Sequence, residues 1–443
     1  MQIEEATSRE AALDLLVSLQ GYDAWKERVE FLAEPGALER FLALVVERVP
    51  YYRAHFAARG TVPAGLGDFP LTTRSDYNAD PAGFVADPLP GEGPRAARTT
   101  SGTTGAPLTI AFDQPAHFHF IDGIFGEYAR TLDPRLVPAM RPGENGIVLV
   151  TNKRTHLRTT VPVVSMKAAM FRRLVIGRRA EEDAAAVQVL RTEPVPILYG
   201  KPTYLLELLE LDRALGGMGR IRPMVILVAG ENLFEDDRAR LEEWFGCVAY
   251  NSYASTEGGL LASECTHRTG LHVASRFVEM EVLTETGEVR REGTGELVLT
   301  NKLNWAMPFV RYRTGDWGTL RLLRCACGYE GPTLVELPGR EARCFDTAHA
   351  SRVDTHTLDR LFFELRVRAF QLIQRSPTRY LVRWAPGEEG VSPEKLQNFA
   401  AELRRHLGEV DLEFESAPRL VERGGKNRRY SIDPSKPIIE NFP

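Results

Sequence analysis

The sequence predicts an α/β protein with a large N-terminal domain, built from mostly parallel sheets plus an antiparallel sub-barrel, and a small α+β C-terminal domain. Three observations support this. Short apolar runs at 146–150, 195–199 and 223–229 alternate with helical patterns, as buried parallel strands do. From Met280 onward, alternating segments separated by turn signals are typical of antiparallel strands. Past Arg340 the pattern changes to that of a smaller α+β unit.

Length and composition limit the functional classes. The chain has 443 residues, more than one ordinary domain, with 43% hydrophobic and 26% charged residues, as in soluble globular proteins. No run of about 18 apolar residues could span a bilayer. A net charge of −5 gives no general attraction to nucleic acid or anionic lipid. The expected partners are therefore small molecules, with no nucleic acid and no membrane.

The compartment follows from the cysteines and the first residues. Five cysteines, an odd number, fit a reducing cytoplasm better than a disulfide framework. Met1–Glu5 carries acids where a signal peptide needs a basic start and an apolar core. We therefore expect a cytoplasmic protein. The sequence does not define the oligomeric state, and a homodimer is compatible with it.

Helices are expected where apolar residues recur at helical spacing. One such stripe runs from Leu38 to Val49 and ends before Pro50. Others cover 118–128 and 204–215. In the C-terminal part, Ser392 and Pro393 have the residue types of an N-cap and a first helical residue. Strands are expected over 108–112, 281–283, 295–300 and 308–312.

The most informative stretch runs from Thr99 to Pro107. Seven consecutive residues, Thr99–Gly105, are Thr, Ser or Gly, and such a run can surround a polyphosphate with N–H groups and hydroxyls. It is not a Walker loop, because no Gly-Lys-Ser/Thr follows and the next segment alternates like a strand. The alternative interpretation is an ordinary polar turn in a β-hairpin.

Four further motifs follow in order: 250–257 (Tyr-Asn-Ser-Tyr-Ala-Ser-Thr-Glu), 312–316 (Tyr-Arg-Thr-Gly-Asp), 339–340 (Gly-Arg) and 424–426 (Gly-Gly-Lys). With the loop, they have the order and spacing found in acyl-adenylate-forming enzymes. From Leu38 to Asp433 the chain resembles that superfamily, and within it the phenylacetate-CoA ligase-like branch. Each motif alone has a structural explanation, and the five together favour an enzyme.

The resemblance implies an ATP- and Mg²⁺-dependent ligase. It would convert a carboxylic acid, by the resemblance an aromatic one, to an acyl-adenylate with release of pyrophosphate, and pass the acyl group to a thiol, CoA first among candidates. It also implies an adenylation domain at 1–340 and a mobile C-terminal domain at 341–443, hinged near Glu341. The acid and the acyl acceptor would be its small-molecule partners.

The resemblance also assigns roles to individual residues. Those expected to bind ATP are Thr100, Ser101, Gly102, Thr103, Thr104 and Gly105 around the phosphates, Gly230, Glu231, Asn251 and Tyr253 around adenine, and Asp316 and Arg340 at the ribose. Catalysis is assigned to Thr256 at the α-phosphate, to Glu257 as a Mg²⁺ ligand and to Lys426, which would bridge the acyl oxygen and the phosphate.

Three departures from the family pattern bear on the function. Ala106 stands where Lys or Arg is usual, and Ala254 where Gly is usual. After Gly339-Arg340, the segment 341–346 lacks the paired Asp and the glycine-containing loop that admits the CoA arm. An enzyme that delivers the acyl group to an amine or a carrier protein is therefore the alternative, and a nucleotide-binding protein that has lost catalysis is a further one.

Cysteine spacing predicts a metal site. Cys325 and Cys327 form a tight pair, and Cys265 lies seven residues before His272. Three sulfurs and one imidazole make a closed tetrahedral Zn²⁺ site, which would be structural. His267 is the alternative imidazole. Against this, Cys-x-Cys is shorter than the usual zinc knuckle, and free cysteines are often merely buried. Some phenylacetate-CoA ligase-like relatives share the pattern, which favours zinc.

Overall fold

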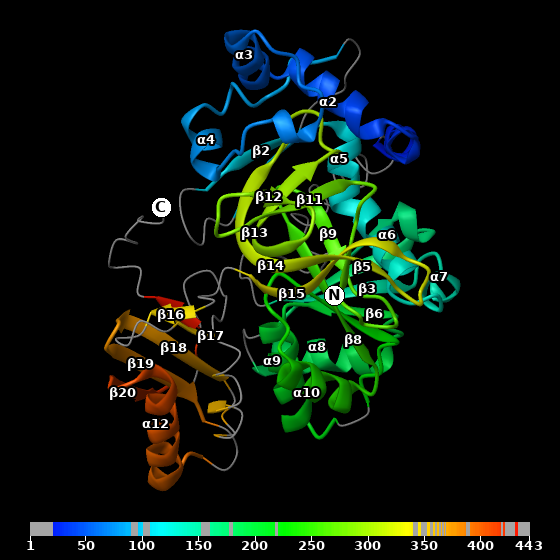
Figure 1. The fold of residues 1–443 in the computed structure, drawn as a ribbon. Helices are drawn as coiled ribbons and strands as arrows, with labels where there is room; N and C mark the ends of the chain where they lie inside the picture. Colours follow the sequence, from blue (N-terminus) through cyan, green and yellow to red (C-terminus); the bar gives the residue numbers. More distant parts are fainter. Residues whose placement is uncertain are drawn as a thin grey trace. The chain divides into compact units, whose positions relative to one another are not determined.

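The structure is a computed structural model. It describes residues 21–89, 96–100, 107–151, 160–176, 180–217, 220–339, 344–346, 352–354, 358, 361–362, 365, 367, 369–386, 390–417, 420 and 430–432. The chain divides into two compact units, Met1–Leu337 and Pro338–Pro443 (Figure 1). The predicted boundary after Arg340 falls on residues 340–343, outside the described ones.

The larger unit is built on one thirteen-stranded sheet in the order β12-β11-β13-β14-β15-β10-β9-β8-β7-β6-β3-β5-β4. The edge strand β4 (Thr160–Val163) pairs antiparallel with β5. Its parallel part consists of β3 (Asn145–Thr151), β5 (Ala169–Val175), β6 (Ile197–Gly200), β7 (Val225–Ala229) and β8 (Val248–Ser255). All five residues of β7 are buried. The three apolar runs therefore form buried parallel strands, as predicted.

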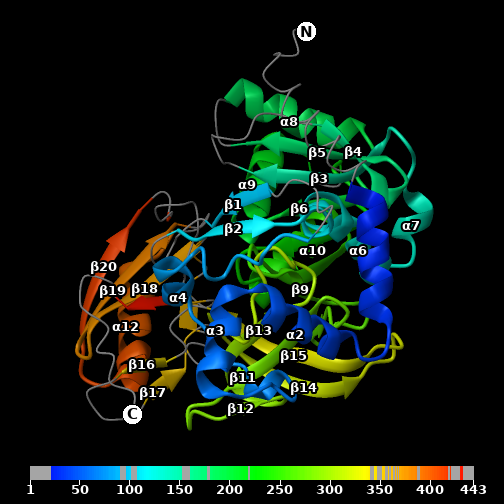
Figure 2. The same ribbon diagram turned by 90° about the horizontal axis from the view of Figure 1, so that it is seen from above.

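Helices cover both faces of the parallel part (Figures 1 and 2). Alternate residues of β7 face opposite layers, because side chains of a strand point alternately to its two faces. Ile226 and Val228 pack with α8 (Ala180–Thr192), α9 (Pro202–Ala214) and α10 (Glu235–Phe245). Val225 and Leu227 pack with α6 (Ile124–Thr131) and α7 (Leu136–Ala139). All five residues of β7 are apolar because helices cover both of its faces.

The predicted antiparallel strands continue the same sheet. They are β9 (Gly259–Ser263), β10 (Leu271–Val273), β11 (Val278–Leu283), β12 (Val289–Arg290), β13 (Gly293–Asn301), β14 (Tyr312–Arg324) and β15 (Glu330–Gly339). Hydrogen bonding is antiparallel from β8 through β9 and β10 to β15, and also from β12 through β11 and β13 to β14. The predicted α/β class is thus confirmed, with parallel and antiparallel parts joined at β8.

One predicted strand is wrong. The segment 308–312 was expected to be a strand, but β14 begins only at Tyr312. The preceding residue, Arg311, has φ 47°. That left-handed conformation is rare for a residue with a side chain and cannot continue an extended strand. Alternation of residue types does not reveal it.

Three helices near the N-terminus pack on the antiparallel part. They are α2 (Ala37–Arg48), α3 (Pro50–Arg59) and α4 (Arg74–Ala79), and their apolar residues share one core with β11, β13 and β14. The predicted helix over 38–49 is α2, which ends before Pro50 as expected. A hairpin of β1 (Ala96–Thr99) and β2 (Thr109–Phe112) flanks the Thr/Ser/Gly loop, with Thr99 opposite Thr109.

The smaller unit is α+β, as predicted. Its four-stranded sheet has the order β20-β19-β18-β21, formed by β20 (Asp411–Ser416), β19 (Arg379–Ala385), β18 (Ala369–Ser376) and β21 (Tyr430–Ile432). A short pair, β16 (Cys344–Asp346) and β17 (Arg352–Asp354), accompanies it. Helix α12 (Pro393–Leu407) packs Phe399 and Leu403 into the core of this unit. The Ser392 hydroxyl caps α12 by accepting from the Lys395 N–H at 3.2 Å.

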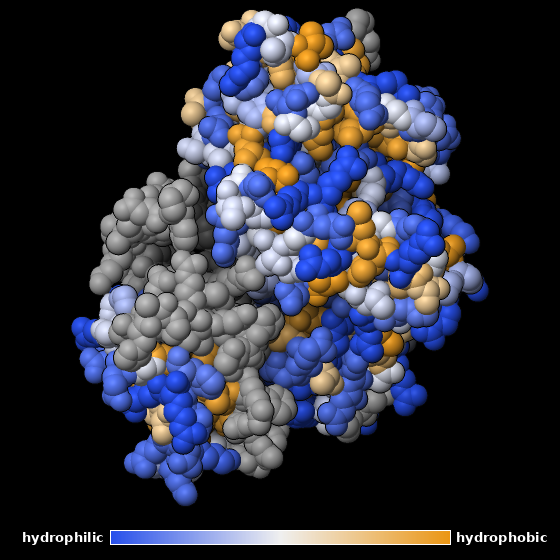
Figure 3. Space-filling model, in the orientation of Figure 1, coloured by the Kyte–Doolittle hydropathy of each residue, from blue (hydrophilic) through white to orange (hydrophobic). Residues whose placement is uncertain are grey.

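The surface of the larger unit carries separate apolar patches among polar residues on the face drawn in Figure 3. Within the described ranges, none of the helices combines the length and the apolar character that crossing a bilayer requires.

Candidate functional site

The predicted nucleotide residues gather at the carboxyl ends of the parallel strands. Val228 pairs with Gly200 on β6 and with Asn251 on β8, so β6, β7 and β8 reach this edge together. Gly230 and Glu231 directly follow β7, and Tyr253 lies on β8. Ligands of open α/β sheets bind at this edge. The apolar run at 223–229 predicted the place of Gly230 and Glu231, which directly follow it, whereas β8, which carries Asn251 and Tyr253, was not among the predicted runs.

Glu231 is held by two residues that the sequence analysis did not single out. The Lys201 Nζ lies 3.1 Å from one carboxylate oxygen, and the Thr203 hydroxyl donates to the other. Gly230 has φ 85°, a conformation that favours glycine at the turn after β7. Lys201 comes after the end of β6, just as Glu231 comes after the end of β7. Its place at the carboxyl end of a parallel strand could have identified Lys201 as a candidate from the sequence.

Tyr253 and Asp316 come together from distant motifs. The tyrosine hydroxyl donates to the Asp316 carboxylate at 2.6 Å, and both residues are half-buried. The turn before Asp316 is held by Glu296, which accepts from the Gly315 N–H at 3.1 Å and pairs with Arg313 at 2.7 Å. The two residues expected at adenine and at ribose are therefore neighbours, as one nucleoside site requires.

Asn251 is fixed through its backbone. Its N–H donates to the Glu264 carboxylate at 2.7 Å, and the Glu264 N–H donates back to the Asn251 carbonyl at 3.0 Å. Arg238 on α10 binds both Glu264 oxygens, at 2.8 and 3.0 Å. This pair is buried, so each charge is balanced by its partner. The position of β8 at the site thus depends on a glutamate adjacent to Cys265.

Glu257 lies in the turn between β8 and β9, after the half-buried Thr256, and its side chain is only 6% exposed. Arg74, the first residue of α4, places Nη2 2.9 Å from Glu257 Oε1. The Tyr312 hydroxyl is 3.5 Å from the same oxygen. Asn301 Nδ2 donates to the Glu257 backbone carbonyl at 2.8 Å. Arg74 and Tyr312 therefore converge on this carboxylate from two other segments, and Asn301 holds the backbone of Glu257.

Thr100 connects this centre to the base of the Thr/Ser/Gly loop. Its hydroxyl accepts from Arg74 Nη1 at 3.3 Å and from the Leu108 N–H at 3.0 Å. Its own N–H donates to the Leu108 carbonyl at 2.9 Å. The two ends of the loop are therefore joined beside Glu257. The other predicted residues, Ser101, Gly102, Thr103, Thr104, Gly105, Arg340 and Lys426, lie outside the described ones.

A buried histidine, His119, lies next to the turn between β8 and β9. His119 belongs to a π-helical stretch, His119–Gly123, between α5 (Gln114–Phe118) and α6. A Cβ on Gly259 would lie 3.7 Å from the His119 ring, and His119 Nδ1 accepts from Trp25 Nε1 at 3.2 Å. Burial lowers the pKa of His119 to about 3, so the ring is neutral at pH 7. π-Helical stretches occur frequently at functional sites.

The predicted metal ligands form one cluster. The ligand atoms of Cys265, His272, Cys325 and Cys327 all lie within 4.8 Å of one another. Cys265 Sγ and Cys325 Sγ are 3.7 Å apart, and Cys327 Sγ is 3.5 Å from His272 Nε2. A zinc tetrahedron with ordinary Zn–S and Zn–N lengths has S···S and S···N edges of about 3.8 and about 3.5 Å. The observed spacings therefore fit zinc.

The surroundings shift the pKa values of two of the thiols in opposite directions. Burial raises the pKa of the Cys265 thiol to about 11. The pKa of Cys325 is lowered to about 7, mainly because the Cys327 backbone N–H donates to its sulfur. His272 Nδ1 is 3.3 Å from the Thr333 hydroxyl, an outer partner that orients the imidazole. The alternative imidazole, His267, is exposed and is not part of the cluster.

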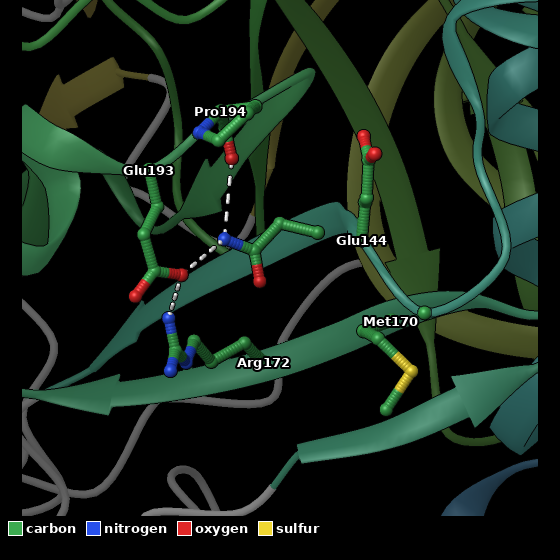
Figure 4. A pocket seen from close by; sticks show the side chains of 7 residues that line it. Glu144, Met170, Arg172, Glu193 and Pro194 are labelled. Carbon is green, nitrogen blue, oxygen red and sulfur yellow. Dashed lines mark hydrogen bonds and ion pairs between the residues drawn. The ribbon is translucent and has the colours of Figure 1, made fainter.

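A shallow pocket of about 450 Å³ lies elsewhere (Figure 4). It is lined by residues at the amino ends of β3 and β6, among them Asn145, Arg172 and Glu193. Asn145 Nδ2 donates to Glu193 Oε2 at 2.9 Å, and Arg172 pairs with the same carboxylate. Its polar groups thus bind one another at the edge opposite the predicted site. We assign it no function.

Comparisons with known proteins agree with the motifs. No protein-family model matches the chain. The phenylacetate-coenzyme A ligase of Thermus thermophilus is 29% identical over 340 residues, 71% of each chain. The Escherichia coli enzyme of the same name is 28% identical over 296 residues, 63% of this chain and 65% of its own length. A crystal structure of 2-hydroxyisobutyryl-CoA ligase has a TM-score of 0.69 and 18% identity, covering 93% of this chain and 90% of that one.

The chain thus shares the fold of this CoA ligase, and its sequence is similar to those of curated phenylacetate-coenzyme A ligases. Four curated proteins of that name are 27–29% identical to the chain, which agrees with the resemblance that the ordered motifs indicated.

Because the pKa of His119 is lowered, we expect the stability of the folded protein to depend on pH. Below about pH 6.5 the imidazole is protonated in the unfolded chain but not in the folded one, so stability falls as the pH falls. Between pH 7.5 and pH 5 this group should cost about 2 kcal/mol. The variant His119→Asn keeps an acceptor near Trp25 Nε1. Over this pH range, its free energy of unfolding, measured with urea, should fall by about 2 kcal/mol less than that of the wild-type protein. An equal loss in both proteins would contradict the neutral, buried imidazole.

Proposed function

We propose that this protein activates a carboxylic acid with ATP, forming an acyl-adenylate and pyrophosphate, and then transfers the acyl group to CoA. The single observation that carries the proposal is the convergence at Glu257. There Arg74 joins the glutamate turn to the base of the hydroxyl-rich loop, and Tyr312 joins it to the motif that contains Asp316. An attack on the α-phosphorus needs the polyphosphate and the reacting oxygen held side by side.

The described residues suit the nucleotide. Tyr253 and Asp316 would hold the nucleoside, with Asn251, Gly230 and Glu231 beside it. One buried carboxylate and one hydroxyl, from Glu257 and Thr100, are too few to form a complete protein cage for a metal. That is the usual situation for Mg²⁺, which takes its remaining ligands from phosphates and water. When bound there, Mg²⁺ would neutralise charge on the phosphates.

The acceptor follows from the relatives. The curated proteins that this chain resembles are named for coenzyme A. The acid is aromatic by the same resemblance, and the half-buried Phe125 on α6 and Tyr199 on β6 are candidates to contact it. We propose that 1–340 and 341–443 are the adenylation domain and the mobile domain, and that Lys426 acts in the first step only. A homodimer and a cytoplasmic location remain expectations.

Pyrophosphate exchange across a panel of aromatic and aliphatic acids, followed by mass spectrometry with CoA or amines, tests the function. We expect exchange that depends on the acid and a CoA ester as product. Exchange with acids but without a CoA ester would favour an amine or a carrier protein as acceptor. Nucleotide binding with no exchange for any acid would indicate a binding protein without catalysis.

We propose that the cluster of Cys265, His272, Cys325 and Cys327 holds a structural Zn²⁺. The cluster supplies four protein ligands, which leaves no open position on the metal for catalysis. Zinc would therefore hold β9, β10 and the β14–β15 connection together.

Glu257→Gln should reduce pyrophosphate exchange by about 10²-fold or more, because it removes a carboxylate charge at the reacting phosphates. The fold should persist, since the amide can still accept from Arg74. Glu193→Gln is the matched control, because Glu193 also pairs with an arginine but lies at the opposite edge of the sheet. Unchanged exchange in Glu257→Gln at saturating Mg²⁺ would exclude the assigned role.

Lys426→Ala should separate the two steps. We expect adenylation to fall by about 10²-fold or more, while turnover of a supplied acyl-adenylate changes little, because the lysine neutralises charge only in the first step. Single-turnover measurement of each step checks this. Comparable losses in both steps would contradict the proposed role and the domain movement.

Protein purified without chelators or metal-affinity resin should contain about one zinc per chain by elemental analysis. Cys265→Ser should lose most of the zinc and melt at a lower temperature, because metal binding is coupled to folding. Cys247→Ser is the control, since Cys247 lies outside the cluster. Zinc-free protein that is as stable as the zinc-containing form would overturn the site.

A further inference from the structure

Arg74 lies between two parts of the nucleotide site that are far apart in the chain. Its guanidinium contacts Thr100 at the base of the loop through Nη1 and Glu257 through Nη2. These contacts engage two of the five N–H groups of a guanidinium. The Arg74 side chain is 19% exposed, so it is neither fully buried nor freely solvated. Its position beside a phosphate-binding loop raises the question of what it binds when ATP is present.

The loop itself supplies no positive charge. No Lys or Arg occurs between Arg98 and Arg130, so Ala106 and the other residues of the loop carry no positive charge. Backbone N–H groups and hydroxyls can bind phosphate oxygens, but they do not neutralise the three to four charges of a nucleoside triphosphate. Guanidinium groups match phosphate geometry with two parallel hydrogen bonds. Arg74 is a described cation in contact with the base of this loop.

The backbone around Arg74 is held firmly. Thr73 caps α4: Asp76 accepts from the Thr73 N–H and hydroxyl, both at 2.7 Å. Thr72 is fully buried and bridges to Tyr312, donating its N–H to the Arg311 carbonyl at 3.0 Å and accepting from the Arg313 N–H at 2.8 Å. Arg74 is therefore anchored to the strand that begins the Tyr-Arg-Thr-Gly-Asp motif. Such an anchored cation is pre-organised for a ligand.

We propose that Arg74 binds the β- and γ-phosphates of ATP and supplies the cation that the loop lacks at position 106. In the protein without nucleotide, Arg74 neutralises the buried Glu257. When the triphosphate enters the loop beside Thr100, the guanidinium binds phosphate oxygens. This inference rests on the proposed function, because it assigns a residue to the same ATP site.

A purely structural role makes a different prediction. If Arg74 only neutralises Glu257, its removal leaves a buried carboxylate unpaired and disturbs the whole site, so every nucleotide should bind more weakly. If Arg74 binds the β- and γ-phosphates, its removal weakens ATP and leaves AMP, which lacks those phosphates, nearly unaffected. Comparing the two nucleotides therefore distinguishes the roles.

The experiment is isothermal titration calorimetry of ATP and AMP, with Mg²⁺ and without acid, on the full-length protein. Arg74→Ala should weaken ATP binding about tenfold or more, the size expected for a lost charge-assisted hydrogen bond, and AMP binding by less than about twofold. Arg74→Lys keeps the positive charge but lacks the planar guanidinium, so it should bind ATP more tightly than Arg74→Ala and less tightly than the wild-type protein. Arg172→Ala is the control, because that arginine is also glutamate-paired and partly buried but distant from the site.

The affinities for ATP and AMP together decide whether Arg74 binds the β- and γ-phosphates. Equal weakening of ATP and AMP, or no weakening of either, would overturn the role of Arg74 while the wild-type protein still binds both nucleotides. If Arg74→Ala does not fold, Arg74→Lys decides, since a loss of ATP affinity with AMP affinity retained supports the proposal and a loss of neither opposes it. A wild-type protein that binds no ATP would overturn the proposed function as well.

Discussion

A buried carboxylate needs a partner, and this constraint organises the centre of the larger unit. An unpaired Glu257 would cost several kcal/mol, because an ionised group loses its hydration when it leaves water. Arg74 provides the charge, and Tyr312 lies at hydrogen-bond distance. Arg74 can reach Glu257 only if α4 starts where it does, which in turn needs Thr72 bridged to Tyr312 and Thr73 as cap. One electrostatic requirement thus links the N-terminal helices, β14 and the β8–β9 turn.

The cysteine cluster has a comparable effect at the other end of β9, where Cys265 follows the strand. Glu264 holds the Asn251 backbone and pairs with Arg238, and the next residue is Cys265. A metal that binds Cys265 together with Cys325 and Cys327 would keep Glu264 in place. The adenine side of the site would then depend on a structural metal that never touches the nucleotide, as outer groups commonly support a functional site.

The arrangement also explains how one sheet serves two purposes. Parallel strands end in loops at one edge, where a ligand can be surrounded, and helices cover both faces. At β8 the sheet becomes antiparallel, and tight connections between neighbouring strands replace helical crossovers. The reversal places Glu257 in a turn rather than at the start of a helix. A carboxylate there can face both the loop at Thr100 and the motif at Tyr312.

The sequence by itself determined the fold class, the order of the motifs and the three cysteines of the cluster. These depend on local patterns, such as apolar runs, hydroxyl-rich stretches and cysteine spacing, which neighbours in the chain decide. Only the tertiary structure decided the contacts between distant residues. Arg74 and Glu257 are 183 residues apart, and the residues around each of them do not indicate which residue it pairs with. The same reason explains why the sequence left His267 and His272 as alternatives, and why the left-handed Arg311 could not be foreseen: its conformation depends on what packs around it.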